Sequence, residues 1–188
     1  MAEATYSAKA QPFLDAIAAG VFSQQEVRDW LVQGTPKTAD FTGSRSLHKE
    51  QERLRPETKQ PFWANLWCGK DVACTCRIPG SRSLETDALF ILESPTQRRL
   101  ALHVEFKHPR ESLQPGQAEG YPLRAACWAD KARCPRRVLP HDEWLTVIFC
   151  DATDLSLPSM KAFDRRIAHQ DARTVIPSYP HQRGATHV

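Results

Sequence analysis

Asp87, Glu105 and Lys107 combine two carboxylates and an amine, a set of groups suited to metal-assisted hydrolysis of a phosphate ester. Asp87 lies at the start of the apolar segment 86–93, and the other two residues end the apolar segment 99–107. Two carboxylates held side by side repel each other unless a cation lies between them. Their oxygens suit Mg²⁺, a hard cation that takes one or two carboxylates and completes its shell with water and phosphate oxygens. Lys107 could then orient or deprotonate a water molecule, or stabilise the charge on a pentavalent phosphate.

Segments 86–93 and 99–107 predict the two strands of an antiparallel hairpin, because both are rich in strand-forming residues and a polar turn separates them. A symmetric turn centred on Thr96 places Asp87 directly opposite Glu105. One face of the hairpin is then wholly apolar and must pack on the core, whereas the other face is apolar near the turn and charged at the far end. A slip of one residue would send one carboxylate to the opposite face.

Other segments predict the elements that must position this hairpin. We expect helices over 11–33 (a hairpin of two), 46–54, 58–67, 115–130 and 157–169, and further strands over 71–78, 143–150 and 172–177. Residues 34–46 are rich in Gly, Ser, Thr and Pro and predict a linker. The predicted organisation is an N-terminal helical hairpin with its linker (1–45), an α/β domain with elements in the order αβββαβ (46–177), and a polar tail (178–188).

The composition is that of a globular protein. The 188 residues are 41% hydrophobic and 25% charged, and the net charge of +3 permits a polyanionic partner without requiring one. No apolar run approaches ~18 residues, so we expect no membrane span. The N-terminal sequence lacks the basic start and continuous apolar region of a signal peptide, so we expect a cytoplasmic protein with reduced cysteines.

Cysteine and tryptophan side chains can bind metals or stack on bases, but in this sequence we expect them to pack in the core. Cys74 and Cys76 are two positions apart and would share one face of a strand, and no second pair follows at zinc-ribbon spacing. These thiols are therefore interpreted as small core side chains rather than zinc ligands. Four tryptophans fall on apolar patterns, which favours packing over stacking on bases: Trp63, Trp67, Trp128 and Trp144.

The pattern of Asp87 followed by Glu105-Phe106-Lys107, within an αβββαβ order, resembles the PD-(D/E)XK nuclease superfamily over residues ~46 to 150. The resemblance implies a restriction-endonuclease-like fold, in which helices flank a mixed central sheet. It also implies that Asp87, Glu105 and the backbone carbonyl of Phe106 hold Mg²⁺, for which Mn²⁺ can substitute. Lys107 would position or activate the attacking water. Thr86 stands where the family's motif has proline.

The resemblance assigns further residues to the site. Many members of the superfamily carry a glutamine on the following helix, and Gln117, with Tyr121 one turn later, lies where that helix should begin. Gln117 would orient Lys107 or the substrate. A glutamate of the family's core helix would correspond to Glu50 or Glu52, and the sequence does not choose between them.

Three more residues lie near the charged end of the hairpin. Glu85 would share a face with Asp87 and could supply a second metal contact. His108 follows Lys107 at the end of the strand and could contact a phosphate. His103 lies on the charged face of the hairpin, where we expect it to be a structural residue.

Together these features predict a metal-dependent nuclease that hydrolyses phosphodiester bonds in nucleic acid, with DNA expected ahead of RNA. The main alternative is a non-catalytic binding or assembly module that keeps the nuclease fold. Another is a repair or phage-defence component that has the same site and acts only with a partner. The N-terminal hairpin could then dock a protein partner, or the chain could form a homodimer. Metal-linked stabilisation would separate a working site from a scaffold.

Overall fold

The computed structural model describes residues 9–56, 60–68, 74–80 and 85–181. The helices are α1 (Gln11–Ser23), α2 (Gln25–Val32), α3 (Thr38–Phe41), α4 (His48–Leu54), α5 (Gln117–Ala129) and α6 (His169–Val175), with 3₁₀ helices η1 (Ala152–Ser156) and η2 (Pro158–Ala162). The strands are β1 (Arg45–Ser46), β2 (Ala64–Trp67), β3 (Glu85–Glu93), β4 (Arg99–Phe106), β5 (Glu143–Cys150) and β6 (Arg165–Ala168). Within the described ranges, none of the helices has the length and apolar character needed to cross a membrane.

The strands form one mixed sheet in the order β1-β3-β4-β5-β6. β3 and β4 are antiparallel, whereas β5 runs parallel to both β4 and β6. β1 and β2 both pair with β3, β1 at the end that contains Glu93 and β2 at the end that contains Glu85. The connection from β4 to β5 contains α5, and the connection from β5 to β6 contains η1 and η2. The expected α/β class, with a mixed central sheet flanked by helices, is confirmed.

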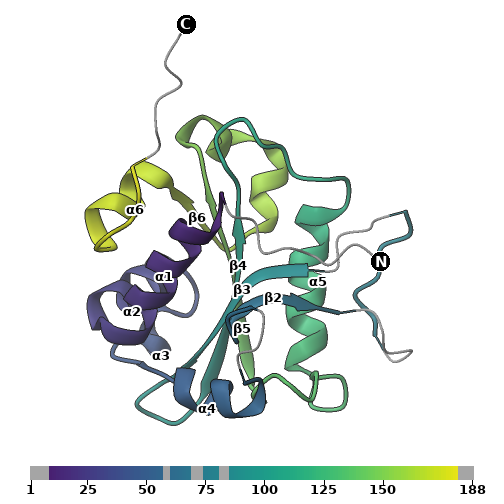
Figure 1. Cartoon of the computed structure of the whole chain (residues 1–188). Coiled ribbons are helices and arrows are strands. Elements are labelled where there is room, and N and C mark those ends of the chain that lie inside the picture. Colours follow the sequence, from purple (N-terminus) through teal and green to yellow (C-terminus); the bar gives the residue numbers. More distant parts are fainter. Residues whose placement is uncertain (1–8, 57–59, 69–73, 81–84, 182–188) are drawn as a thin grey trace, which may run out of the picture.

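Helices cover both faces of this sheet, with α1, α2 and α6 on one side and α5 on the other (Figure 1). Side chains of β3 alternate between the two layers. Ala88 and Phe90 pack with Ile17 of α1 and Leu31 of α2, whereas the other face of the hairpin packs with Trp128 of α5. The N-terminal helical hairpin therefore shares a core with the sheet.

The β3–β4 hairpin has the register that a turn centred on Thr96 requires. Glu93 pairs with Arg99, and the pairing continues to Ala88 and Val104. The hairpin face predicted to be wholly apolar lies in the same core as α1 and α2. The register on which the proposed pairing of Asp87 with Glu105 depends is therefore confirmed as far as the adjoining pair, Ala88 and Val104.

The described part of 58–67 contains no α-helix, so the predicted aromatic helix is wrong, and β2 lies there instead. Pro61 disfavours a helix through this segment. Arg55 donates hydrogen bonds to the carbonyl oxygens of Phe62 and Ala64, at 2.8 and 2.6 Å, and so binds carbonyls that a helix would use internally. The aromatic residues of so short a segment fit a strand as well as a helix.

The predicted helix over 157–169 and the predicted strand over 172–177 are both wrong. The first segment contains η2 and β6, and β6 extends the sheet parallel to β5. The Asp164 carboxylate supports this path, because it accepts hydrogen bonds from the amide and hydroxyl of Thr146, both at 2.8 Å. The second segment begins in α6, where Ala172 is buried one helical turn before a buried Ile176.

Two more predicted segments differ from the structure. Residues 34–46 are more than a linker, because they contain α3 and β1 and bury Phe41 completely. Of the strand predicted over 71–78, only residues 74–78 lie among the described residues, and they form no regular element. The order α4, β2, β3, β4, α5, β5 nevertheless follows the expected αβββαβ pattern, with β2 as its first strand.

Candidate active site

Asp87 and Glu105 lie at the end of the β3–β4 hairpin that is farthest from its turn. The paired register reaches Ala88 and Val104, which immediately adjoin the two acids. Beyond that pair, Oδ2 of Asp87 accepts a hydrogen bond from the Phe106 amide at 2.8 Å. This bond holds the Asp87 carboxylate against the end of β4, next to the residue that follows Glu105.

Glu105 is completely buried, and its two oxygens have different surroundings. Oε1 accepts a hydrogen bond of 2.6 Å from Nε2 of Gln117 and lies 3.1 Å from Nζ of Lys107. Oε2 is buried, and no hydrogen bond of ordinary geometry reaches it from the described residues, although the Tyr121 hydroxyl lies close enough to lower the pKa of this carboxyl against the effect of burial. An unsatisfied buried carboxylate oxygen is costly, which makes it a candidate ligand atom.

Three carboxyl groups of this region have raised pKa values. Burial, and then the charge of Glu105, raise the pKa of Asp87 well above its usual range. The same two causes raise the pKa of Glu85 to about 7. Burial raises the pKa of Glu105 despite the opposing attraction of Lys107. A cation bound between these carboxylates would reduce the repulsion between them and favour their ionised forms.

Lys107 is a buried cation beside these acids. Its Nζ lies 3.1 Å from Oε1 of Glu105 and 3.6 Å from Oε1 of Glu111. Burial by itself would lower the pKa of Lys107, but attraction to the nearby carboxylates, that of Glu105 first, raises it overall. A protonated amine suits the binding of a negatively charged oxygen better than the removal of a proton.

The backbone of Lys107 is fixed from the C-terminal part of the chain. Its carbonyl oxygen accepts a hydrogen bond from Nε2 of His169 at 2.8 Å, and Nδ1 of His169 lies 2.8 Å from the Tyr179 hydroxyl. Burial lowers the pKa of His169, so the neutral ring accepts from Tyr179 at Nδ1. Tyr179 is itself buried, so the predicted polar tail 178–188 starts within the core.

Helix α5 presents three polar side chains to the hairpin at helical spacing: Gln117, Tyr121 and Arg124. The Tyr121 hydroxyl donates to the carbonyl of Val104 at 3.2 Å and accepts from the amide of Asp87 at 3.3 Å. Tyr121 therefore joins the ends of β3 and β4 from a completely buried position.

Arg124 was not singled out in the sequence, although it is completely buried behind the acids. Its Nε donates to the Thr86 hydroxyl at 2.8 Å, and its guanidinium lies 4.4 Å from the ring centre of Tyr121. Its positive charge partly offsets the rise in the pKa of Glu85. The spacing of seven residues from Gln117 places both side chains on one helical face and could have revealed it.

A cavity of about 360 Å³ opens onto the acids. Its lining consists of Trp67, Gly80, Glu85, Asp87, Gln114, Pro115 and Gln117. Trp67 is 48% exposed, so the prediction that it packs in the core is wrong. The cavity thus combines two carboxylates with an accessible aromatic side chain.

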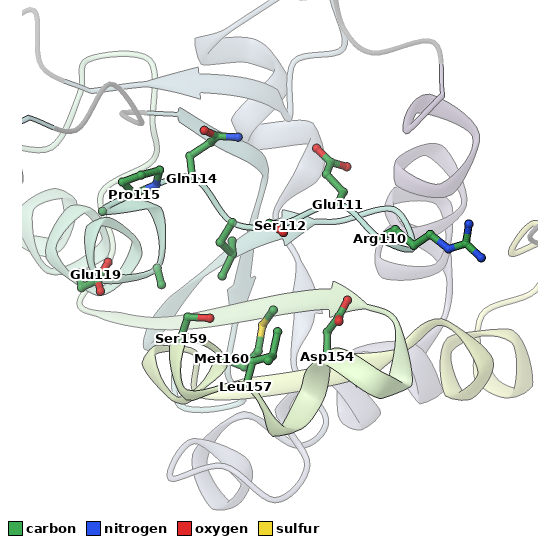
Figure 2. Close-up of a pocket in the computed structure, with 13 residues that line it drawn as sticks. Arg110, Glu111, Ser112, Gln114, Pro115, Glu119, Asp154, Leu157, Ser159 and Met160 are labelled. Atoms are coloured by element: carbon green, nitrogen blue, oxygen red, sulfur yellow. The ribbon is translucent and has the colours of Figure 1, made fainter.

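A second cavity, of about 320 Å³, shares Gln114 and Pro115 with the first. It lies between the loop that carries Arg110 and the segment that carries Asp154 and Met160 (Figure 2). Neither carboxylate of the β3–β4 pair lines it. We therefore place the candidate chemistry in the cavity that contains Asp87.

Glu50 and Glu52 do not lie at this site, so the assignment of either as its core-helix acid is wrong. Glu50 lies 3.2 Å from Arg45, which also pairs with Glu93 at 2.7 Å, at the turn end of the hairpin. Glu52 is exposed on the same short helix, α4. α4 follows β1, and β1 pairs with the end of β3 opposite Asp87.

His108 and Phe106 lie toward the other face of the sheet from Glu105. The His108 ring packs edge-on against Phe13 and Phe106, with ring centres 5.7 and 4.9 Å apart. A phosphate contact from His108 stays a prediction, as does the role of the Phe106 carbonyl as a metal ligand. His103 is completely buried and its ring lies against a tryptophan of α5, consistent with a structural residue.

The residues at the hairpin end fit a hard divalent cation. Asp87 and Glu105 offer carboxylate oxygens, Glu85 is close enough to affect them electrostatically, and Oε2 of Glu105 is unpartnered within the described part of the chain. Comparison of the chain with protein-family models, with curated proteins and with solved structures finds no match. The functional argument therefore rests on the residues themselves.

Proposed function

We propose that this chain is a metal-dependent nuclease with a restriction-endonuclease-like fold that hydrolyses phosphodiester bonds in nucleic acid, DNA ahead of RNA. The observation that carries the proposal is the buried Glu105 carboxylate. Gln117 and Lys107 occupy one of its oxygens, and the other lacks a hydrogen-bond partner in the described residues. A divalent cation would satisfy that oxygen and also relieve the repulsion between Glu105 and Asp87.

Asp87 and Glu105 would hold Mg²⁺, or Mn²⁺ in its place, with the Phe106 carbonyl as a third ligand. Glu85 would add a further oxygen from the cavity wall. A cation bound here supplies a Lewis acid for a phosphate oxygen and favours ionisation of a water molecule. The protein's own contribution is to hold these oxygens in place, through the bond from the Phe106 amide to Asp87 and the bond from Gln117 to Glu105.

Lys107 acts in this proposal as a fixed positive charge. Its raised pKa keeps it protonated at neutral pH, so it would orient the attacking water and stabilise the charge that develops on the phosphate. Gln117 donates to Glu105 rather than to Lys107 or to substrate, so its proposed role is to orient the carboxylate. Both residues are buried, which limits their motion during the reaction.

The exposed indole of Trp67 supports nucleic acid as the class of phosphodiester. Trp67 lines the cavity that contains Asp87 and Glu85, so a base next to the scissile phosphate could stack on it. The order of elements from α4 to β5 supports the restriction-endonuclease-like fold. The two acids also adjoin the last paired residues of adjacent antiparallel strands, β3 and β4, which supports the same fold.

The test is a cleavage assay on supercoiled plasmid, linear duplex, single-stranded DNA and RNA, with Mg²⁺, with Mn²⁺ and with no added divalent cation. Lys107→Ala and Asp87→Asn are the test variants, and Lys49→Ala, on the exposed side of α4, is the matched control. We expect metal-dependent cutting by the wild type and Lys49→Ala, and none by the other two.

Two results would contradict the proposal. Equal cutting by the wild type and Lys107→Ala would indicate a contaminating nuclease. No cutting together with no Mn²⁺-induced rise in melting temperature would favour the non-catalytic binding module. A rise in melting temperature that Asp87→Asn abolishes, without cutting, would support the metal site and indicate a partner-dependent enzyme.

A further inference from the structure

Four cysteines from two distant parts of the chain converge on the α5 side of the sheet. The Sγ atoms of Cys68, Cys74, Cys76 and Cys127 all lie within 4.8 Å of one another. The Sγ atoms are 2.9 Å apart in Cys74 and Cys76, 3.2 Å apart in Cys68 and Cys74, and 3.3 Å apart in Cys68 and Cys76. Cys68 directly follows β2, whereas Cys127 belongs to α5.

The expectation that Cys76 packs in the core is confirmed, since Cys76 and Cys127 are both buried in the apolar cluster beneath α5. Packing alone does not require four thiols to meet at one point, because any small apolar side chain would fill that space. All four sulfurs are thiols rather than halves of disulfides. The cluster therefore offers four soft ligand atoms directed at a shared centre.

The spacing of the sulfurs indicates the size of the ligand. A tetrahedral ion with metal–sulfur bonds of about 2.3 Å holds its sulfurs about 3.8 Å apart. The observed separations, from 2.9 Å to at most 4.8 Å, bracket that value. An iron–sulfur cluster places several atoms between its thiolates and would need them farther apart.

We propose that Cys68, Cys74, Cys76 and Cys127 bind one Zn²⁺ ion as a structural tetrathiolate site. Four protein ligands leave no open position on zinc, which is typical of structural rather than catalytic sites. Arg133 donates a hydrogen bond of 2.8 Å to the hydroxyl of Thr75, between two of the ligands. The same guanidinium pairs with Asp130 at 2.7 Å, so this bond ties the ligand-bearing segment to the residues that follow α5.

The zinc ion would fasten the segment after β2 to α5. Trp67 immediately precedes the first ligand and lines the acidic cavity, so the ion would fix one wall of that cavity. The inference does not depend on the proposed nuclease activity, because the two sites use different residues and different ligand atoms.

The test is the metal content of the full chain after purification from zinc-supplemented cells. We expect one zinc ion per wild-type chain and per Lys107→Ala chain, and a large loss of zinc from Cys74→Ser. Cys134→Ser is the matched control, because Cys134 is also partly buried against the same apolar cluster but lies outside the four-thiol group. It should keep one zinc ion per chain.

Cobalt substitution keeps the test decisive if Cys74→Ser fails to fold. Wild-type protein refolded with Co²⁺ should show the strong visible bands and thiolate charge-transfer absorption of a tetrathiolate. Absence of both stoichiometric zinc and the cobalt–thiolate spectrum from the wild type would overturn the proposal. So would iron in place of zinc, or full zinc retention by Cys74→Ser.

Discussion

The two clusters of ligand atoms differ in chemistry and in origin. The acidic cluster consists of oxygens from two adjacent strands, and it adjoins an open cavity. The thiol cluster consists of sulfurs from cysteines that follow β2 and from helix α5, half of them buried, and a zinc ion held by all four would have no position for a substrate. The difference separates a site suited to chemistry from one suited to holding the fold together.

Helix α5 links the two clusters. Gln117, in its first turn, donates to Glu105, and Cys127, in its last turn, belongs to the thiol cluster. The two residues are ten positions apart, which corresponds to about 15 Å along a helix. Substitutions at the thiol end of α5 should therefore mainly lower the stability of the protein. Substitutions at the acidic end should mainly lower its activity.

Cys127→Ser should give the largest effect and should lower the free energy of unfolding by about 4 kcal/mol. Loss of one ligand weakens zinc binding, and the binding free energy of a structural metal is part of the folding free energy. Urea unfolding followed by circular dichroism would measure it. Cys150→Ser replaces another buried thiol outside the cluster and should cost only about 1 kcal/mol. Equal losses in both variants would mean that the cluster binds no stabilising ion.

If the proposed function holds, Lys107→Ala should lower the cleavage rate at least ~100-fold, or about 2.7 kcal/mol in activation free energy, because it removes the cation proposed to stabilise the transition state. Single-turnover cleavage with saturating Mg²⁺ would measure the rate. The zinc content of the Lys107→Ala protein should equal that of the wild type. Loss of zinc together with activity would show that the two clusters are not independent.

Without added divalent cation, stability should fall between pH 5 and pH 8. The pKa of Glu85 is raised from 4.5 to about 7 in the folded state, so the folded state binds more protons than the unfolded state in this range. The resulting stabilisation is complete below pH 4.5 and is lost as pH rises through 7, by about 2 kcal/mol once solvent screening of the partly exposed carboxyl is allowed for. Urea unfolding measured across this pH range would show that the free energy of unfolding falls less steeply with pH for Glu85→Gln than for the wild type.

Glu119→Gln is the control for the pH experiment, since Glu119 is exposed on α5 and lines the second cavity but not the first. It should leave the pH dependence of the unfolding free energy unchanged. An unchanged slope for Glu85→Gln as well would exclude Glu85 as the source of that dependence.

Trp67→Ala should give the smallest effect, a roughly 10-fold loss of affinity for a single-stranded oligonucleotide, or about 1.4 kcal/mol. The indole is exposed at the acidic cavity and would lose its stacking partner there. Fluorescence anisotropy with a labelled oligonucleotide would measure it. Leu157→Ala removes a similarly exposed side chain from the second cavity and should have no effect. The reverse result would place the nucleic acid in that second cavity.

The hairpin and the residues of its charged end could be predicted from the sequence because their signals are local. Alternation along β3 and β4 and a single turn at Thr96 fix the register, and the register brings Asp87 next to the end of β4. The predicted position of Gln117 at the start of the following helix also matches its contact with Glu105.

The remaining features depend on contacts between segments distant in sequence. Cys127 lies 51 residues beyond Cys76, and neither spacing nor periodicity shows that α5 brings it to the same point. The segment that forms β2 carries a pattern compatible with both helix and strand, and its pairing with β3 decides between them. Glu50 had a suitable residue type, but β1 directs α4 to the wrong end of β3.

The contact of His169 with the carbonyl of Lys107, and of Tyr179 with His169, bears on the timing of synthesis. A ribosome extends the chain from its N-terminus, so Glu85, Asp87 and Glu105 emerge long before Tyr179 does. Until the segment that contains His169 and Tyr179 is available to fold, the carbonyl of Lys107 lacks its hydrogen bond from His169. Under the proposed function, a nascent chain would acquire its full cutting capacity only after the segment that contains His169 and Tyr179 has left the ribosome and folded.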